Sequence, residues 1–254
     1  MSAGVTGDAS NPAFTDPRLV ALYDTDNPPG ADHDYYRGLA DELDARTVID
    51  LGCGTGSLTV TYARDGRSVT GIDPSAAMLD VARHRAGGEQ VAWVLGDASA
   101  IEATRKADLA VMTGNAIQAL GPAQFDEAVE AVAGALRPGG VFAFETRNPA
   151  DRAWEEWARE EPTIRDTEHG PLREWLEIAP PGQDGTVRMR CHSLFESTGE
   201  RVTELMELTF RDRHTLTNAL TAAGFAEVHV WRDWRRTPFE GEGRIMVVEA
   251  RRAG

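Results

Sequence analysis

Cysteine is scarce in this sequence, whose 254 residues include only Cys53 and Cys191. Two cysteines cannot build a disulfide framework, and Cys53 lies in a glycine-rich turn where its small size matters more than its thiol. The six histidines are scattered, and neither a CxxC nor an HxxxH spacing occurs. The sequence therefore predicts neither a structural nor a catalytic metal site.

Long apolar runs and an excess of basic residues are also missing. No apolar stretch approaches the roughly 20 residues of a membrane-spanning helix, and the first residues lack the basic-then-apolar pattern of a secretory signal. The formal net charge is −15, which would repel phosphate backbones and anionic membranes. We therefore expect a cytoplasmic protein that binds small molecules, with neither nucleic acid nor a membrane as partner. No feature of the sequence predicts an oligomeric state.

The order of apolar runs predicts the fold class. Short strand-like runs at 48–51, 68–73, 90–95, 108–112 and 141–144 are separated by segments of helical periodicity, among them 75–85 and 124–136. Such alternation is typical of a parallel sheet with helices on both faces. Residues 58–62 are rich in β-formers, but the topology requires a helix there, and propensity is the weaker guide. The turn at 137–140, Arg-Pro-Gly-Gly, should end the preceding helix.

The flanking segments complete a prediction of domain organisation. Residues 1–16 are small, polar and aperiodic, and we expect them to be disordered. Residues 17–254 should form a single domain that begins with two short helices at 17–23 and 32–43. Within it, 148–211 should form an antiparallel insertion or lid, with one helix and strands at 172–178, 186–195 and 201–210. A helix at 215–223 and two strands at 227–231 and 245–250, paired antiparallel, should end the chain.

A glycine-rich turn after the first strand carries most of the chemical information. Residues 48–56 read VIDLGCGTG, so glycines at alternate positions let the backbone turn sharply and approach a ligand closely. A pyrophosphate-binding GxGxxG pattern would need glycine where Ser57 stands, and the lysine of a P-loop is absent. Asp50 directly precedes the turn, and a carboxylate there suits a cationic ligand better than a pyrophosphate.

Two further aspartates end the next two strands. Asp73 lies in GIDPS, about twenty residues after the turn, where a carboxylate can accept hydrogen bonds from ribose hydroxyls. Asp97 lies in GDA, where it can meet an adenine amino group while Ala98 offers its backbone. For both carboxylates, a helix-capping or surface role is the alternative interpretation.

VIDLGCGTG, GIDPS, GDA and the later LRPGG occur in that order, and together they resemble the class I S-adenosylmethionine-dependent methyltransferase family. The resemblance covers roughly 47–144 and, more loosely, 216–250. It implies a doubly wound, mostly parallel, seven-stranded Rossmann-like sheet with an antiparallel insertion, and S-adenosylmethionine as cofactor. It also implies a methyltransferase that moves the methyl group to a small-molecule acceptor by in-line displacement.

The resemblance assigns roles to individual residues. Gly52, Cys53 and Gly54 should surround the methionine part of the cofactor, and Asp50 should orient the turn or the amino group. Asp73 should bind the ribose, with Pro74 and Ser75 near the adenine, and Asp97 and Ala98 should contact the adenine ring. The loop after the fourth strand, which contains Thr113 and Asn115, should face both the sulfonium and the acceptor, with Asn115 touching the methionine part. The alternative for Asn115 is that its side chain satisfies backbone groups of the loop. The Asn/Asp-Pro-Pro-Tyr/Phe signature of some relatives that methylate DNA or protein is absent there.

The acceptor and the catalytic base are less defined. Aromatic side chains in the N-terminal helices and the insertion are candidates to line the acceptor pocket: Tyr23, Tyr35, Tyr36, Trp154, Trp157 and Trp175. The alternative is that the tryptophans simply pack the insertion against the sheet. A general base is needed only for a protonated acceptor. By residue type alone, the candidates are His33, His169, His192, His214 and Glu145, so the catalytic residue stays unassigned.

Other functions remain open at this stage. A nicotinamide-dependent oxidoreductase would also place a glycine turn after the first strand, although Ser57 and the lack of flanking basic residues oppose it. A cofactor-binding protein without methyl transfer, or an enzyme that uses the same cofactor for another reaction, would share every motif above.

Overall fold

The computed structural model describes residues 11–12, 14–64, 66–103, 106–158 and 161–254. Its main element is a seven-stranded sheet in the order β11-β12-β6-β5-β2-β3-β4. Across the sheet, the strands are β11 (Phe225–Trp231), β12 (Ile245–Arg252), β6 (Leu136–Arg147), β5 (Ala107–Met112), β2 (Thr47–Leu51), β3 (Ser68–Asp73) and β4 (Ala92–Leu95). The five strands from β6 to β4 are parallel, and β12 runs antiparallel to both of its neighbours, β6 and β11. The predicted fold class is confirmed.

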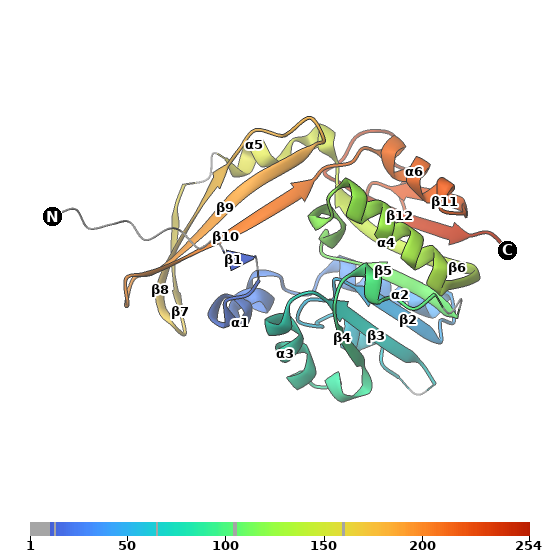
Figure 1. The fold of residues 1–254 in the computed structure, drawn as a ribbon, viewed down its shortest axis with the longest axis horizontal. Coiled ribbons are helices and arrows are strands. Elements are labelled where there is room, and N and C mark those ends of the chain that lie inside the picture. Colours follow the sequence, from blue (N-terminus) through green and yellow to red (C-terminus); the bar gives the residue numbers. More distant parts are fainter. Residues whose placement is uncertain (1–10, 13, 65, 104–105, 159–160) are drawn as a thin grey trace.

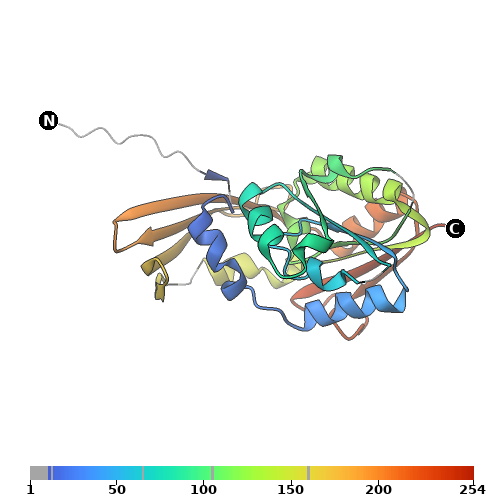
Figure 2. The same ribbon diagram turned by 90° about the horizontal axis from the view of Figure 1, so that it is seen from below.

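Helices cover both faces of this sheet (Figure 2). On one face lies α2 (Ala31–Glu42), whose buried Tyr36 and Leu39 pack on β2 and β5. On the other lie α4 (Pro122–Ala135) and α6 (Arg213–Ala222), whose apolar side chains meet Phe142 and Phe144 of β6. The central strands are therefore buried on both sides, which explains their continuous apolar sequences.

The remaining helices lie around the carboxyl edge of the sheet or between strands. The α-helices are α1 (Pro17–Asp26), α3 (Ala76–His84) and α5 (Ala153–Trp157). The 3₁₀ helices are η1 (Thr59–Tyr62), η2 (Gly88–Gln90), η3 (Ala98–Ala100), η4 (Ala116–Ala119) and η5 (Pro149–Asp151). Within the described ranges, no helix has the length and apolar character needed to cross a membrane.

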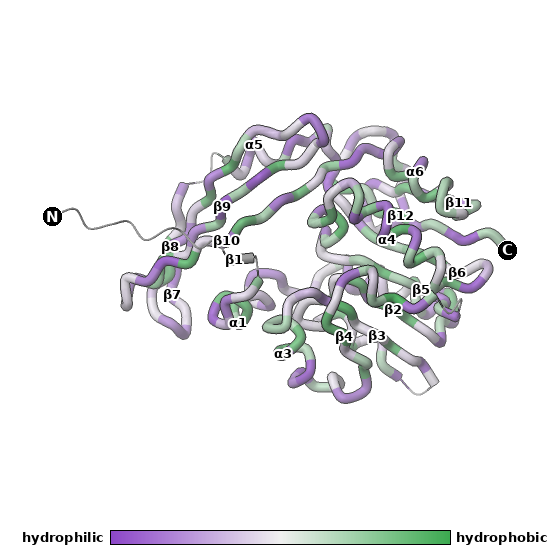
Figure 3. Tube along the Cα trace, viewed as in Figure 1, coloured by the Kyte–Doolittle hydropathy of each residue, from purple (hydrophilic) through white to green (hydrophobic). Residues whose placement is uncertain are grey.

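A second sheet, of order β1-β10-β9-β8-β7, projects from the α/β body and reaches over α1 (Figure 1). It comprises β1 (Asn11–Pro12), β7 (Thr163–Thr167), β8 (Gly170–Ile178), β9 (Thr186–Phe195) and β10 (Glu200–Thr209). Strands β7 to β10 are antiparallel, as the sequence predicts. Hydropathy alternates along β9 and β10 (Figure 3), which is typical of a sheet with one covered face.

Three local predictions need correction. Strand β6 begins at Leu136, so 137–140 do not form a separate turn: the register passes from Ala107↔Leu136 to Leu109↔Val141, which makes these residues a bulge within the strand. Gly139 permits it because its φ is +77°. Strand β4 starts at Ala92, after η2, and β7 was not predicted.

Two expectations concern helical and disordered segments. The topology-based helix at 58–62 is confirmed, although only as the single 3₁₀ turn η1, in which Tyr62 is fully buried. The prediction of disorder at 1–16 is wrong for the part that the structure describes, because β1 pairs with β10 and the Asp16 carboxylate caps α1. Residues 1–10 and 13 lie outside the described ranges.

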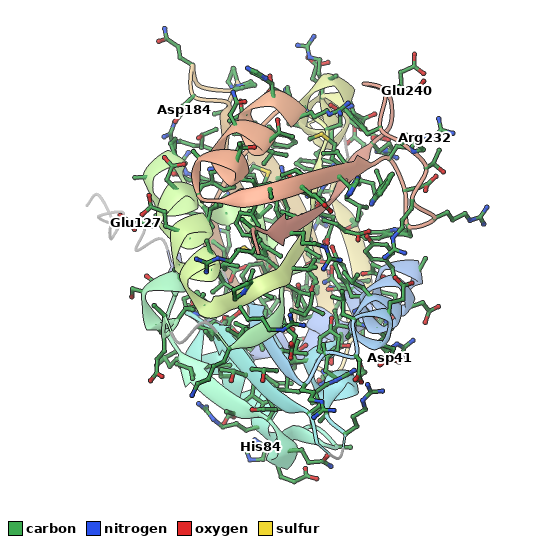
Figure 4. The ribbon with its side chains drawn as sticks, turned by 90° about the vertical axis from the view of Figure 1, so that its right-hand side faces the viewer. Asp41, His84, Glu127, Asp184, Arg232 and Glu240 are labelled. Atoms are coloured by element: carbon green, nitrogen blue, oxygen red, sulfur yellow. The ribbon has the colours of Figure 1, made fainter. Side chains whose placement is uncertain are left out.

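Most charged side chains lie on the surface of the α/β body, although a few, such as Asp50 and Glu145, are buried within it. In Figure 4, Asp41 of α2, Glu127 of α4 and Arg232 after β11 point outward from the molecule. This distribution is the ordinary one for an acidic globular protein.

Candidate cofactor and acceptor site

The glycine turn joins β2 to η1 at the carboxyl edge of the sheet. Gly52, Gly54 and Gly56 have φ values of +74°, +55° and +72°, which disfavour residues with a Cβ. At Gly56, a Cβ would also come within 2.5 Å of the Trp93 ring. The turn is held against β3, because the N–H groups of Gly52 and Cys53 both donate to the carbonyl of Ile72, at 2.7 and 3.1 Å.

Asp73 ties this turn to the end of β3. Its Oδ2 accepts a 2.8 Å hydrogen bond from the Gly54 N–H, and its Oδ1 accepts one of 2.8 Å from the Ser75 N–H. The side chain is 7% exposed, and burial raises its pKa. A carboxylate oxygen has two acceptor positions, so each oxygen keeps one for a ligand hydroxyl.

Asp50 lies beneath the turn. Its Oδ2 accepts a 2.6 Å hydrogen bond from the Thr59 hydroxyl, and its buried Oδ1 has no partner among the described residues. Burial raises its pKa to about 7. Asp50 therefore supports the turn through η1 and leaves one acceptor unused at its base.

The loop after β5 is fixed from below by a buried carboxylate. Asn115 adopts a left-handed conformation with φ +57°, and its N–H donates to Glu145 Oε1 at 2.6 Å. Glu145 Oε2 accepts a 2.5 Å hydrogen bond from the Tyr36 hydroxyl. Burial raises the pKa of Glu145 to about 7. The Asn115 Oδ1 atom is buried without a partner among the described residues, which makes it a second unused acceptor.

Tyr36 and Tyr35 do not occupy the positions that the sequence predicts. Tyr36 is fully buried, so its ring fills the core below the β5 loop instead of lining an open pocket. The Tyr35 hydroxyl donates to Glu249 Oε1 of β12 at 2.6 Å, and its ring packs against Trp234. Buried tyrosine hydroxyls need hydrogen-bond acceptors, and the carboxylates of Glu145 and Glu249 supply them. Both tyrosines therefore lie away from the expected acceptor pocket.

Tyr23 of α1 lies over both loops. A Cβ placed on Gly54 would lie 4.0 Å from its ring, and one on Gly114 would lie 4.0 Å from its hydroxyl. The next residue, Asp24, anchors α1 by accepting a 2.6 Å hydrogen bond from the Thr55 hydroxyl and pairing with Arg85. Tyr23 thus lies beside both loops on an anchored helix, and its contact with the acceptor stays a prediction.

Phe14 forms a strap that the sequence did not reveal. Its N–H donates to Glu204 of β10 at 2.7 Å, and its carbonyl accepts a 2.6 Å hydrogen bond from the Ser75 hydroxyl. Its ring meets that of Tyr23 edge-on at 5.7 Å. No local pattern signals the two hydrogen bonds, since their partners Glu204 and Ser75 lie 190 and 61 positions away along the chain.

The tryptophans lie on different surfaces of the insertion. Trp154 packs edge-on against Phe210 at 4.6 Å, and Trp157 lies 6.3 Å from the same ring. Trp175 stacks on His192 at 4.8 Å. Trp175 points to the opposite face from Ile178, a member of the cluster around Trp154, because strand side chains alternate. Trp154 and Trp157 therefore both pack against apolar residues of the insertion itself, while Trp175 is separated from them.

Asp97 and the cysteine make local contacts. The exposed Asp97 caps η3, and its Oδ1 accepts from the Ser99 N–H and hydroxyl at 2.9 and 2.6 Å, which lowers its pKa. This is the capping role named as its alternative, and contact with adenine stays a prediction.

Burial raises the pKa of Cys53 well above its ordinary range, so its thiol stays protonated. Ala98 and Thr113 are half-buried and Pro74 is exposed.

The candidate bases are dispersed. Both Glu145 oxygens already accept hydrogen bonds, so Glu145 positions the β5 loop. His192 lies under Trp175, and His214 bonds Asn218 on the exposed side of α6. Burial lowers the pKa of His33 in α2. None of these contacts singles out a general base.

A seven-stranded sheet of this order with a glycine turn after β2 defines a Rossmann-like cofactor-binding domain. Residues 48–140 match the sequence model of a methyltransferase domain. This part of the chain is thus similar to a methyltransferase domain, in agreement with its motifs.

Relatives and solved structures agree with this assignment. The chain is 34% identical over 137 residues to an uncharacterized methyltransferase of Mycobacterium tuberculosis, covering 54% of each protein. It is 34% identical over 113 residues to a ubiquinone biosynthesis O-methyltransferase of Serratia proteamaculans, covering 43% of this chain and 46% of that one. The chain thus spans about half the length of the curated relatives it matches.

Two solved structures share the whole fold. The sugar N-methyltransferase KedS8 from Streptoalloteichus superposes with a TM-score of 0.75 at 20% identity, covering 100% of this chain and 99% of that one. The CcbJ methyltransferase from Streptomyces caelestis gives 0.73 at 23% identity, covering 94% and 97%. At these identities the likeness concerns the fold, including the projecting antiparallel sheet.

Proposed function

We propose that this protein transfers the methyl group of S-adenosylmethionine to a small-molecule acceptor. The main observation behind the proposal is that the backbone N–H groups of the glycine turn already donate hydrogen bonds to other atoms of the protein. Four N–H groups already donate to protein oxygens: those of residues 52, 53, 54 and 56. A pyrophosphate needs such N–H groups free, so the turn disfavours a nicotinamide dinucleotide.

The unused polar atoms fit a cationic cofactor. Asp50 Oδ1 and Asn115 Oδ1 are both acceptors without a partner among the described residues. Buried acceptors are normally satisfied, and an ammonium group supplies donors for them. Asp73 keeps acceptor positions for ribose hydroxyls, and the glycines leave room for close approach.

The proposal extends to the residues that hold the cofactor. Asp73 binds the ribose, and Gly52, Cys53 and Gly54 enclose the methionine part above Asp50. Pro74, Ser75, Asp97 and Ala98 border the adenine. Thr113 and Asn115 face the sulfonium. These assignments are supported by the shared carboxyl edge from which the residues project.

When bound, the cofactor supplies an activated methyl group with a neutral leaving group, so the protein's task is alignment. Glu145 and Tyr36 hold the Asn115 loop rigid, and Tyr23 covers it from α1. Such fixed geometry can contribute about 7 kcal/mol or more to lowering the barrier. A general base would be required only for a protonated acceptor.

The surroundings support the remaining parts of the proposal. Residues 148–211 act as a lid over the acceptor. Tyr23 of α1 and Trp157 of the lid line the acceptor pocket. A small molecule is favoured because the neighbouring structures include a sugar N-methyltransferase and, at a TM-score of 0.68 and 24% identity, an amino pentose methyltransferase. Cys53 and Cys191 are both free thiols, which is typical of a cytoplasmic protein.

The first experiment measures by calorimetry which cofactor the purified protein binds. We expect S-adenosylmethionine and S-adenosylhomocysteine to bind the purified protein, and NAD not to bind. Release of S-adenosylhomocysteine on adding candidate acceptors then separates an enzyme from a binding protein. Tight binding of NAD without binding of either sulfur compound would contradict the proposal.

A further inference from the structure

Arg147 lies at the carboxyl edge of the sheet and has no role in the function proposed above. It is the last residue of β6 and lies two positions beyond Glu145, hence on the same face of the strand. Its side chain is half-buried. Its Nη1 donates to Gln118 Oε1 of η4 at 3.1 Å, and its guanidinium lies 4.9 Å from the centre of the Trp157 ring. Figure 1 shows α5, which carries Trp157, where the two sheets meet.

Its guanidinium makes no ion pair within the described ranges, although the charge of Glu145 on the same strand acts on it from further away. Among the described residues, no carboxylate lies within the 4.0 Å of an ion pair with Arg147. The nearby arginines do have such partners: Arg152 pairs with Glu155, and Arg244 pairs with Asp151 and Glu156. A guanidinium has five N–H donors, and burial lowers the pKa of Arg147. Partial burial of an unpaired cation is costly.

Gln118 adds a second donor at the same place. It is fully buried, its Oε1 accepts from Arg147, and its Nε2 has no partner among the described residues. The amide orientation is fixed by this contact, because a flipped amide would set two donors against each other. The Arg147 guanidinium and the Gln118 amide N–H₂ thus lie next to each other beside the Trp157 ring. Both keep N–H groups that donate to no acceptor among the described residues.

We propose that Arg147 and Gln118 bind an oxyanion of the acceptor, a carboxylate or a phosphate, while Trp157 packs against the acceptor's apolar part. Arginine matches oxyanions through its planar fork of donors. The inference rests on the proposed methyl transfer and narrows its substrate class to anionic small molecules.

Arg147 lies on the strand that supports the loop proposed to face the cofactor. Glu145 bonds the Asn115 backbone, and Arg147 lies two strand residues further, about 7 Å along β6. Arg147 is therefore a specificity-determining residue.

The test measures ligand binding to protein saturated with S-adenosylhomocysteine, so it does not depend on turnover. The probes are phenyl phosphate, benzoate and the neutral benzyl alcohol, titrated by calorimetry or by ligand NMR line broadening. We expect at least one anion to bind more tightly than benzyl alcohol. Arg147→Gln should weaken that anion at least about fivefold and leave benzyl alcohol unchanged. The anion that binds more tightly identifies phosphate or carboxylate as the recognised group.

Two variants serve as controls. Arg244→Gln removes a neighbouring, carboxylate-paired arginine and should change anion affinity less than twofold. Arg147→Lys keeps the charge without the planar fork and should retain part of the affinity. Circular dichroism and unchanged S-adenosylhomocysteine affinity show that each variant is folded.

The possible failures are distinguishable. If S-adenosylhomocysteine binds but neither anion does, or if Arg147→Gln binds the anion as the wild type does, the oxyanion site is wrong and the methyltransferase proposal stands. If S-adenosylhomocysteine itself does not bind, the proposed function fails, and the acceptor site fails with it.

Discussion

The backbone N–H of Gly54 donates a 2.8 Å hydrogen bond to Oδ2 of Asp73, and this bond joins the turn after β2 to the end of β3. The two residues are 19 positions apart, and each belongs to a different motif of the sequence. The carboxylate that we propose for the ribose therefore also shapes the turn that we propose for the methionine part.

Replacing Asp73 should impair both functions. Asp73→Ala leaves the Gly54 and Ser75 N–H groups without their acceptor, and it removes the proposed ribose ligand. We expect S-adenosylhomocysteine binding to weaken by at least about 1 kcal/mol, measured by calorimetry. Asp80→Ala, on the exposed side of α3, is the matched control and should have no effect. Equal affinities for the two variants would refute the ribose assignment.

Glycine is required at position 56 for two separable reasons. Gly56→Ala must adopt φ near +72° and place its Cβ 2.5 Å from Trp93. Gly66→Ala meets a similar φ of +81° but has open space around the Cβ. We expect Gly66→Ala to cost about 1 kcal/mol of unfolding free energy and Gly56→Ala at least about 1 kcal/mol more. Urea denaturation measures both, and similar losses would show that Trp93 moves aside freely.

The buried Glu145 should make stability depend on pH. Burial raises its pKa from 4.5 to about 7, so the folded state keeps the proton that the unfolded state loses. The stability linked to this proton is complete below about pH 4.5 and declines as the pH rises towards 7. Glu145→Gln is neutral throughout and lacks this decline.

The measurement compares the two proteins at two pH values. Glu145→Gln should cost more unfolding free energy at about pH 5 than at about pH 7.5, by at least about 1 kcal/mol. Asp50 has a similarly raised pKa, but it is present in both proteins and cancels. A cost independent of pH would mean that Glu145 is already ionised in the folded protein.

Arg85 should control how firmly α1 covers the turn. It pairs with Asp24 of α1, and its Nε donates to the Thr55 carbonyl at 3.0 Å. We expect Arg85→Met to speed hydrogen exchange in α1 at least about fivefold, because local opening then breaks fewer contacts, and to hasten release of S-adenosylhomocysteine. Arg37→Met breaks only an exposed ion pair with Asp34 on α2 and should change neither. Unaltered exchange in α1 would contradict this anchoring role.

Local patterns determined the elements and the turn. The runs that became β2, β3 and β5 contain several consecutive buried residues because a parallel sheet covered by helices buries both faces of its strands. The turn could be identified because only glycine adopts its backbone angles readily. The bulge in β6 was missed for a related reason: Arg-Pro-Gly-Gly has the composition of a turn, and only pairing with β5 keeps it within the strand.

The sequence by itself thus determined the fold class, the cofactor motifs and the existence of an insertion, since each is encoded in neighbouring residues. The tertiary structure alone decided which side chains meet. Tyr36 finds Glu145 across 109 positions, and Phe14 finds Glu204 across 190. A buried hydroxyl, carboxylate or amide must find a partner, but nothing in its own segment specifies which one. That choice depends on how the chain folds back on itself. The same folding placed Arg147 beside Trp157, without an ion-pair partner in the part of the chain that the structure describes.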